Sequence, residues 1–486
     1  MTFVSEFEPQ ALWKHFDQIL TIPRGSKNEE QMRRYVIGLA ERCGLSYKTD
    51  DPGNVVVQKP GADGRENAAI TILQSHLDMV NEKNSDVEHD FDKDPIIPQL
   101  DGDYLKASGT TLGSDNGIGV AAMLALMESQ EVAHGPLEFL FTIDEETGLT
   151  GATLLADGML DGRCLLNLDS EDEGVLTIGC AGGADTNLSL ALKFEAAPQA
   201  AAALEVSLSG LKGGHSGVDI HLQRGNAVQL LARAVLAASL NTPLQLAAFQ
   251  GGNKHNAIPR EAIATLVVSG LENTGPVGSD LVKELEQIRK EYRPAEPGMQ
   301  FKIGEAQVPS QVWAADTTEK ALNLVNALPH GVLSMSYEIP ELVETSTNLA
   351  AVQQSNGSLS ILMSSRSSVA SALEALRRRI RSAAMLAGTG IEEPQGYPGW
   401  EPDVDSHLLK VVRRLHKDVL GTEPEVTAVH AGLECGIIGE KYPGMDMISY
   451  GPQIEFPHSQ DERVKIGTVA DFYKLLSATL EELGKE

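Results

Sequence analysis

Histidine and aspartate residues follow two apolar runs of the sequence. His76 and Asp78 lie just beyond AITILQ, and Asp169 comes directly after CLLNL. Residues two apart in a strand project to the same side, so His76 and Asp78 would lie together at a strand end. Ligands of open α/β sheets bind at the carboxyl ends of strands, where these groups could hold one. A single His-x-Asp pair is nevertheless explained more simply as a polar cap on the strand.

Asp115 lies in a glycine-rich segment, residues 113–119, just before the helical pattern VAAMLALMES. An aspartate at such a junction is often an N-cap, and the glycines then serve only to allow a tight turn. A carboxylate fixed by a tight turn could alternatively bridge two cations, because both of its oxygens face outward. The residues alone leave both interpretations open.

Three consecutive carboxylates, Asp144, Glu145 and Glu146, directly follow the strand pattern LEFLF. At a buried strand end they would repel one another, at a high cost in free energy unless cations neutralise them. A solvated acidic turn is the alternative. Because adjacent side chains point in different directions, one glutamate could bind a metal ion while the other faces a water molecule, as metal-assisted hydrolysis requires.

His458, in the segment FPHS, supplies a second imidazole close to the C-terminus. A lone histidine beside a proline is more often a structural hydrogen-bonding group than a metal ligand. Two imidazoles together with several carboxylates at strand ends, however, suit zinc, cobalt or manganese. In two-metal sites the ions lie about 3.5 to 4 Å apart with a carboxylate or hydroxide between them.

The segments that position these residues alternate between strand and helix patterns. We expect an α/β fold: a catalytic α/β/α domain with a mixed central sheet, interrupted by an inserted α+β domain. The segment GCAGGAD interrupts the first pattern, and alternating strands such as ALEVSLSG follow it, with a hairpin expected at residues 355–357. The pattern returns to α/β after GYPGW. The expected parts are therefore residues 1–184, 185–395 and 396–486.

Composition excludes several classes of partner. The chain has 486 residues and 42% hydrophobic content, which is enough for a large core and more than one domain. Its formal net charge of -29 disfavours nucleic acid and anionic lipid. The four cysteines are scattered, and we find neither a leader pattern nor an apolar stretch approaching the ~20 residues that span a bilayer. We expect a cytoplasmic protein that binds neither nucleic acid nor a membrane.

Seven motifs occur in a fixed order between His76 and Val464. They are HLD, GSDNG, DEETG, LDSEDEG, GGHSG, HAGLECG and PHSQDERV. In these motifs and their order, over nearly the whole chain, the sequence resembles the cytosolic non-specific dipeptidases, also called aminoacyl-histidine dipeptidases or peptidase D. That family belongs to the dizinc exopeptidases with an inserted lid domain.

The resemblance implies a centre of two divalent metal ions per subunit, with zinc expected first and cobalt or manganese as alternatives. The metal ligands that it implies are His76, Asp115, Glu146, Asp169 and His458. Asp115 would bridge the ions and Asp78 would orient His76. Glu145 would be the general base toward a metal-activated water.

The resemblance also assigns an outer set of residues. His215 in GGHSG would stabilise the oxyanion of the scissile amide, which makes it a third catalytic candidate beside Glu145 and Asp78. Asn256 and Arg366 would hold the carbonyl or the terminal carboxylate of the substrate, and Glu434 could pair with its amine. Read from the residues alone, His215 could equally belong to an ordinary glycine-rich turn.

We therefore expect a metallopeptidase that hydrolyses dipeptides of broad specificity, including Xaa-His, with a lid that limits substrate length. An aminoacylase or amidohydrolase of the same superfamily is the alternative within enzymes, and a catalytically silent peptide-binding protein is the alternative outside them. Relatives dimerise through the lid, so a homodimer is expected. Some relatives with long lids act as monomers, so a monomer is the alternative to the homodimer.

Overall fold

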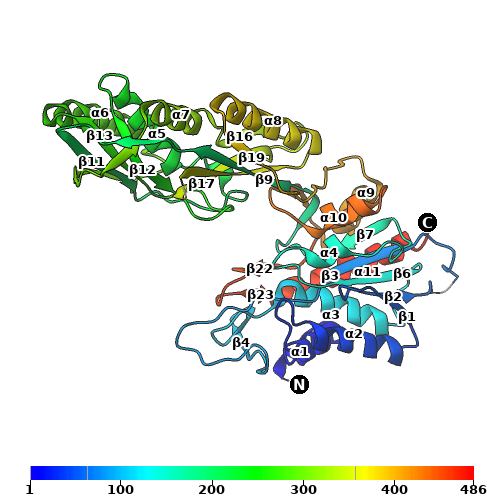
Figure 1. Cartoon of the computed structure of the whole chain (residues 1–486). Coiled ribbons are helices and arrows are strands. Elements are labelled where there is room, and N and C mark those ends of the chain that lie inside the picture. Colours follow the sequence, from blue (N-terminus) through cyan, green and yellow to red (C-terminus); the bar gives the residue numbers. More distant parts are fainter. Residues whose placement is uncertain (1, 63, 356) are drawn as a thin grey trace. The chain divides into compact units, whose positions relative to one another are not determined.

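The structure is a computed structural model that describes residues 2–62, 64–355 and 357–486. The chain divides into two compact units. Unit 1 consists of residues 1–180, 400–428 and 433–486, and unit 2 consists of residues 181–399 and 429–432. Figure 1 follows the chain through both units in sequence colours. The chain thus leaves unit 1 for one long insertion and later for a few residues that include His430.

Unit 1 is built around a mixed eight-stranded sheet with the order β1-β2-β6-β3-β7-β21-β8-β20. Its strands are β1 (Ser46–Thr49), β2 (Val55–Lys59), β3 (Thr71–His76), β6 (Leu137–Thr142), β7 (Cys164–Asn167), β8 (Val175–Cys180), β20 (Glu425–Val429) and β21 (Asp446–Ser449). Strands β6, β3, β7 and β21 run parallel, while β1, β2 and β8 are antiparallel to neighbours. The expected α/β fold with a mixed central sheet is confirmed.

The helices of unit 1 are amphipathic or fully apolar according to where they pack. They are α1 (Gln10–Ile19), α2 (Glu30–Arg42), α3 (Ser114–Glu128), α4 (Thr150–Leu154), α9 (His407–Leu420), α10 (Glu434–Lys441) and α11 (Ile466–Leu483). Helix α3 is buried along nearly its whole length and contacts α1, α2 and β3. Its run GVAAMLALM presents apolar side chains in every direction, as a helix enclosed on all sides requires.

A small antiparallel sheet joins the end of the chain to the segment between β3 and α3. Its order is β22-β23-β5-β4, with strands β4 (Pro98–Asp101), β5 (Tyr104–Ala107), β22 (Ile454–Glu455) and β23 (Arg463–Lys465). Pairing of β23 with β5 fixes the loop between β22 and β23, which carries His458. This sheet therefore anchors a C-terminal loop within the first part of unit 1.

Unit 2 is an antiparallel sheet covered by helices. Its strands are β9 (Gly182–Ala191), β10 (Phe194–Ala196), β11 (Ala201–Ser209), β12 (Gln245–Gly251), β13 (Ala262–Ser269), β14 (Gln300–Ala306), β15 (Gln311–Trp313), β16 (Gly331–Met335), β17 (Val343–Ser355), β18 (Ser358–Ser367) and β19 (Gly390–Glu392). Its helices are α5 (Ala227–Ser239), α6 (Thr274–Tyr292), α7 (Ala315–Ala327) and α8 (Ala370–Ala387). The four helices lie on one face of the main sheet in Figure 1.

The main sheet of unit 2 has the order β14-β11-β13-β12-β17-β18-β9-β19, with β16 beside β17. One apolar core lies between this sheet and the helices, and it includes Leu231 of α5, Leu285 of α6 and Leu266 of β13. Strands β17 and β18 pair as the expected hairpin, with Ser355 opposite Ser358. Asn356, within that expected turn, lies outside the described residues.

Two further features bear on the composition. All four cysteines carry free thiols. Among the helices of the described ranges, none has both the length and the apolar character needed to cross a membrane.

Candidate metal centre

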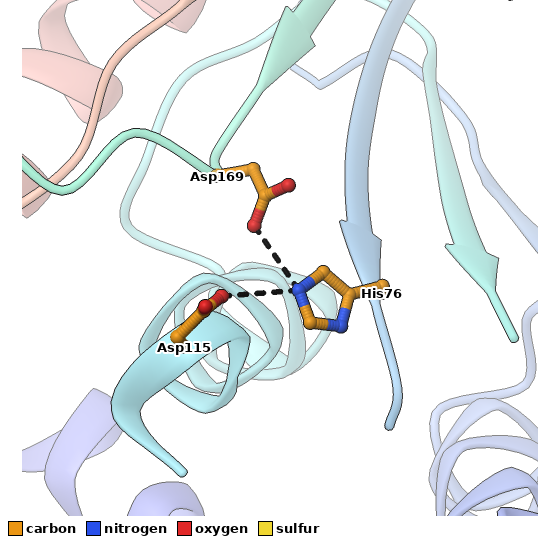
Figure 2. Close-up of side chains that lie close together, drawn as sticks. All are labelled: His76, Asp115 and Asp169. Carbon is orange, nitrogen blue, oxygen red and sulfur yellow. Dashed lines mark hydrogen bonds and ion pairs between the residues drawn. The ribbon is translucent and has the colours of Figure 1, made fainter. Parts of the chain in front are cut away.

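The strand ends of the parallel part of the sheet bring the predicted metal ligands together. His76 ends β3, the three acids Asp144 to Glu146 follow β6, and Asp169 follows β7 closely. Because these strands are parallel neighbours, their carboxyl ends meet at one edge of the sheet. Asp115 reaches the same place from the first turn of α3 (Figure 2).

One ring nitrogen of His76 faces two carboxylates. Nε2 of His76 lies 3.1 Å from Oδ1 of Asp115 and 3.2 Å from Oδ1 of Asp169. Figure 2 shows both carboxylates pointing at this nitrogen, one from α3 and one from the loop after β7. The side chains of all three residues are largely buried. Three ligand atoms so placed could hold one cation.

His458 forms a second group of the same kind. Its Nε2 lies 3.2 Å from Oδ2 of Asp115 and 3.0 Å from Oε2 of Glu146. The other oxygen of Glu146 is buried without a hydrogen-bond partner among the described residues. Asp115 therefore offers one oxygen to each of two ligand groups, as a carboxylate shared by two ions would. The imidazole of His458 is half-exposed, so the second group opens to solvent.

The electrostatics of the site indicate a shortage of positive charge. Burial raises the pKa of Asp169 to about 6, although the neighbouring His76 opposes this rise. Burial likewise raises the pKa of Glu145 well above its usual range, and the negative charges of Asp169, Glu434 and Glu146 add to the effect. Hydrogen bonds with Asp115 and Glu146 raise the pKa of His458 to about 11. Divalent cations would supply the missing positive charge.

Asp78 organises both His76 and the turn of acidic residues. Its Oδ1 lies 3.4 Å from Nδ1 of His76. The backbone N–H groups of Glu145 and Glu146 donate to its two oxygens over 3.1 and 3.2 Å, and the Ser26 hydroxyl also donates. Burial opposes ionisation, yet the hydrogen bonds and the charge of His76 bring the pKa of Asp78 down to about 2. This one carboxylate therefore fixes two ligand segments.

Asp144, the first of the three acids, has a different function in the structure. It adopts a left-handed backbone conformation with φ of 48°. The hydroxyls of Thr147 and Thr150 donate to its two oxygens, each over 2.5 Å, and its own N–H donates to Glu29. Glu29, Asp78 and Asp144 come close enough to form another acidic cluster. The carboxylate of Asp144 is engaged by hydroxyl donors of its own turn, so it closes the turn that presents Glu145 and Glu146.

Glu434 begins α10 and is fully buried. Its Oε2 accepts hydrogen bonds from Nε2 of Gln74 over 2.6 Å and from the Thr142 hydroxyl over 2.7 Å. Its Oε1 has no hydrogen-bond partner in the part of the chain that the structure describes. Burial raises the pKa of this carboxyl to about 7. Glu434 thus lies among the ends of β3 and β6.

The remaining predicted residues belong to unit 2. Nδ1 of His215 accepts backbone hydrogen bonds from Gly217 and Val218 over 3.2 and 3.1 Å. In the neutral ring the proton is therefore on Nε2, which makes that nitrogen a donor. Burial, reinforced by the charge of Arg366, lowers the pKa of His215 and so favours this neutral form.

Arg366 is nearly buried in β18, where its Nη1 donates to the Tyr397 hydroxyl over 2.8 Å. The side chain of Asn256 is exposed, and its carbonyl accepts from the N–H of Ser216. His215 and Asn256 share the lining of a hollow of about 1130 Å³ with the cationic residues Lys212 and Arg260. His215 and Asn256 thus share one hollow with positively charged side chains, and Arg366 is not among its lining residues.

Several residues that organise the centre were not anticipated from the sequence. Asn116 donates to the Leu168 carbonyl over 2.8 Å and to the carboxylate of Asp169. Arg24 and Glu462 contact the loop that carries Asp115. Glu462 lies inside the motif PHSQDERV, which was a signal available in the sequence. Arg24, in the segment TIPRGS, stands in no motif that marks it.

The sequence matches one peptidase family and resembles known dipeptidases over nearly its whole length. Residues 72–482 match peptidase family M20/M25/M40. The cytosol non-specific dipeptidase of Escherichia coli strain K12 is 40% identical over 484 residues, which cover 99% of each chain. The crystal structure of aminoacylhistidine dipeptidase from Vibrio alginolyticus has a TM-score of 0.93 and 42% identity, over 99% of this chain and 98% of that one.

A more distant structure shares the fold alone. Aminopeptidase PepT from Bacillus cereus has a TM-score of 0.57 at 16% identity, over 98% of this chain and 99% of that one.

Proposed function

Because the chain belongs to peptidase family M20/M25/M40, we propose that it hydrolyses dipeptides of broad specificity, including Xaa-His dipeptides, with two divalent metal ions. The observation that carries this proposal is the position of Asp115, whose two oxygens face two separate ligand groups. Two relatives that match the chain over nearly its full length are named as dipeptidases. Since one of them is a cytosol enzyme, we extend the proposal to a cytoplasmic location.

We propose that each of the two ligand groups holds one ion. His76, Asp115 and Asp169 would hold one ion, and Asp115, Glu146 and His458 would hold the other. Imidazole and carboxylate ligands suit zinc first, with cobalt or manganese as alternatives. When bound, such ions lower the pKa of water and polarise a peptide carbonyl.

Glu145 is the proposed general base. Its backbone N–H donates to Asp78, and its carboxyl lies close to the proposed metal ligands His76 and Glu146. Glu145 would take a proton from the attacking water as the new C–O bond forms. It would then deliver that proton to the amine nitrogen as the C–N bond breaks.

Residues of unit 2 would complete substrate recognition. The proton on Nε2 of His215 makes that side chain a suitable donor to an oxyanion. Arg366 can bind a terminal carboxylate, and Asn256 can bind a carbonyl. Glu434 of unit 1 would pair with the substrate amine through its second oxygen. We also propose that unit 2 acts as a lid and that two chains pair through it.

The test is a metal-dependent assay of the full chain. The protein is stripped of metal with a chelator, reloaded with zinc, cobalt or manganese, and assayed on dipeptides, tripeptides and N-acyl amino acids. We expect dipeptide cleavage that returns with metal. Glu145→Gln should lower kcat about 10² to 10⁴-fold, because it removes the base while keeping the shape. The matched control is Glu131→Gln, at an exposed glutamate of the same unit, which should leave kcat unchanged.

The same panel separates the competing functions. Cleavage of N-acyl amino acids in preference to dipeptides would identify an aminoacylase, because such substrates have no free amine. Metal binding without any cleavage would identify a peptide-binding protein. Full activity of Glu145→Gln would contradict the proposed base.

A further inference from the structure

The peptide groups on either side of Gly113 are bound by two buried, oppositely charged side chains from distant parts of unit 1. The N–H of Gly113 donates to Oε2 of Glu462 over 2.9 Å, and its carbonyl accepts from Nη2 of Arg24. Glu462 is 2% exposed and Arg24 is 3% exposed. Gly113 has φ of 73°, and a Cβ there would lie 2.5 Å from Nη2 of Arg24. A Cβ would also lie 2.8 Å from Sδ of Met79, so both the space and the positive φ favour glycine here.

Glu462 accepts hydrogen bonds from each residue of the turn that leads into α3, from Leu112 to Asp115. Its Oε2 also accepts from the N–H of Leu112 over 2.8 Å. Its Oε1 accepts from the N–H and the hydroxyl of Ser114 over 2.7 and 2.6 Å, and from the N–H of Asp115 over 3.3 Å. Asp115 and Asn116 depart from helical geometry, so these N–H groups lie in a turn before the regular part of α3 and need an acceptor from another segment. One side chain therefore sets the position of the turn that presents Asp115.

The backbone of Glu462 links this residue to the loop that carries His458. Glu462 lies four residues after His458, and its N–H donates to the Ser459 carbonyl over 3.1 Å, which closes a turn between them. A displacement of Glu462 would consequently move the contacts of Asp115 and the loop of His458 together.

Arg24 makes the corresponding link to His76. Its Nη1 donates to the carbonyls of Leu77 and Asp78 over 3.0 and 2.7 Å, in the two residues that follow His76. Its Nη2 reaches the carbonyl of Gly113. Burial of one of these charges without the other would be costly, since an unpaired buried charge loses its hydration without compensation. Arg24 and Glu462 thus form a pair with the loop of Asp115 held between them.

We propose that Glu462 and Arg24 are positioning residues of the metal centre. They hold Asp115 at the distance from His76 and His458 that allows it to serve both ligand groups. The inference rests on the proposed function, because it takes both groups to bind ions. Neither residue is proposed to touch an ion or a substrate. The alternative is that Glu462 merely stabilises the fold, as any buried carboxylate bound to backbone amides would.

Glu138 provides the matched control for that alternative. It is also buried in unit 1, and it accepts from the backbone N–H groups of Asp161 and Gly162, at the opposite end of β6 from the acidic turn. Glu138→Gln removes a buried carboxylate of the same type without touching the centre.

The experiment compares Glu462→Gln, Glu462→Asp, Arg24→Lys and Glu138→Gln in the full chain. Zinc binding is measured by calorimetric titration, ligand geometry by the visible absorption of the cobalt-loaded protein, and folding by thermal unfolding of the metal-free protein. In Glu462→Gln an amide NH₂ would face N–H donors, so the loop of Asp115 must move. We expect affinity for both ions to fall together by about 10 to 100-fold, with a changed cobalt spectrum.

Glu462→Asp keeps the charge and should recover part of the zinc affinity. Arg24→Lys should lower the affinity for both ions by less than Glu462→Gln does. Glu138→Gln should alter thermal unfolding alone. Wild-type affinities and cobalt spectra in both Glu462→Gln and Arg24→Lys would overturn the inference. So would equal losses in Glu138→Gln. If the wild-type protein itself binds no pair of ions or cleaves no dipeptide, the proposed function fails instead, which is a different result.

Discussion

Glu434 is held inside unit 1 by Gln74, whose Nε2 donates to Oε2 of Glu434 over 2.6 Å, with both side chains fully buried. Oε2 also accepts from the Thr142 hydroxyl, and Oε1 has no hydrogen-bond partner among the described residues. A role in binding the amine of a substrate would therefore have to use that oxygen.

The substitution Glu434→Gln tests this role. The amide oxygen can keep the hydrogen bonds from Gln74 and Thr142, while the NH₂ group takes the place of Oε1, so the variant should fold. If Oε1 pairs with the substrate amine, KM for dipeptides should rise about ten-fold or more at nearly constant kcat, because a charged hydrogen bond contributes about 1.5 to 3 kcal/mol. Steady-state kinetics measure both constants. Unchanged KM would remove Glu434 from the substrate-binding residues.

Asp115→Asn should weaken binding of both ions, because its two oxygens face different histidines. Asp169→Asn should weaken binding of only the ion near His76, because the Asp169 carboxylate belongs only to that ligand group. Zinc content after dialysis at fixed free zinc distinguishes the two variants. Retention of two tightly bound ions in Asp115→Asn would show that the carboxylate is not shared.

Asp78→Asn should reduce kcat by about 10 to 100-fold, with a smaller effect on KM. An amide cannot accept two backbone N–H groups through both of its terminal atoms, so the turn of Glu145 and Glu146 loses one anchor. The control is Asp50→Asn, where a carboxylate of the same unit accepts the N–H groups of Gly53 and Asn54. Equal losses of kcat in both variants would point to general destabilisation.

His330 should make the stability of unit 2 depend on pH. Burial lowers the pKa of this ring to about 4, and its Nδ1 accepts from the N–H of Leu349 over 3.4 Å. Between that value and the ordinary pKa of about 6.5, the unfolded chain binds a proton that the folded chain excludes. Stability should therefore be complete above about pH 6.5 and fall by about 3 kcal/mol as pH drops toward 4.

The measurement for His330 is hydrogen exchange of unit 2 peptides between pH 4 and 7, corrected for the intrinsic rate. Burial also lowers the pKa of His430, to about 3. His330→Gln keeps an acceptor that does not titrate, so the difference in pH dependence between the two proteins isolates the contribution of His330. A pH dependence that is the same in both would exclude His330 as its source.

The sequence predicted the strand ends well because the patterns that mark buried strands are local. AITILQ, LEFLF and CLLNL became β3, β6 and β7, and their parallel pairing brought together residues that no spacing could join. The division of labour between Glu145 and Glu146 was beyond the residue pattern, because both follow the same strand. Oε2 of Glu146 faces His458, whereas the function of Glu145 as base stays a prediction.

Features that depend on contacts between distant segments could not be predicted from the sequence. Arg24 and Glu462 contact the same loop although they lie near opposite ends of the sequence. The hydropathy pattern gives no indication of such a pairing. The assignment of Val429–Gly432 to unit 2 is also invisible in the sequence, since so short a stretch has no pattern of its own.

The place of β21 between β7 and β8 has a consequence for synthesis of the chain. β21 leaves the ribosome only after all of unit 2, so β7 and β8 must wait for the strand that separates them. Until then the nascent sheet has an open edge, which is a template for pairing with other chains. The insertion can fold earlier because most of its contacts lie within one continuous stretch, while the sheet of unit 1 depends on non-local pairing and closes late. Emergence of β21, rather than synthesis of the first strands, would therefore be the step that lets the sheet of unit 1 close.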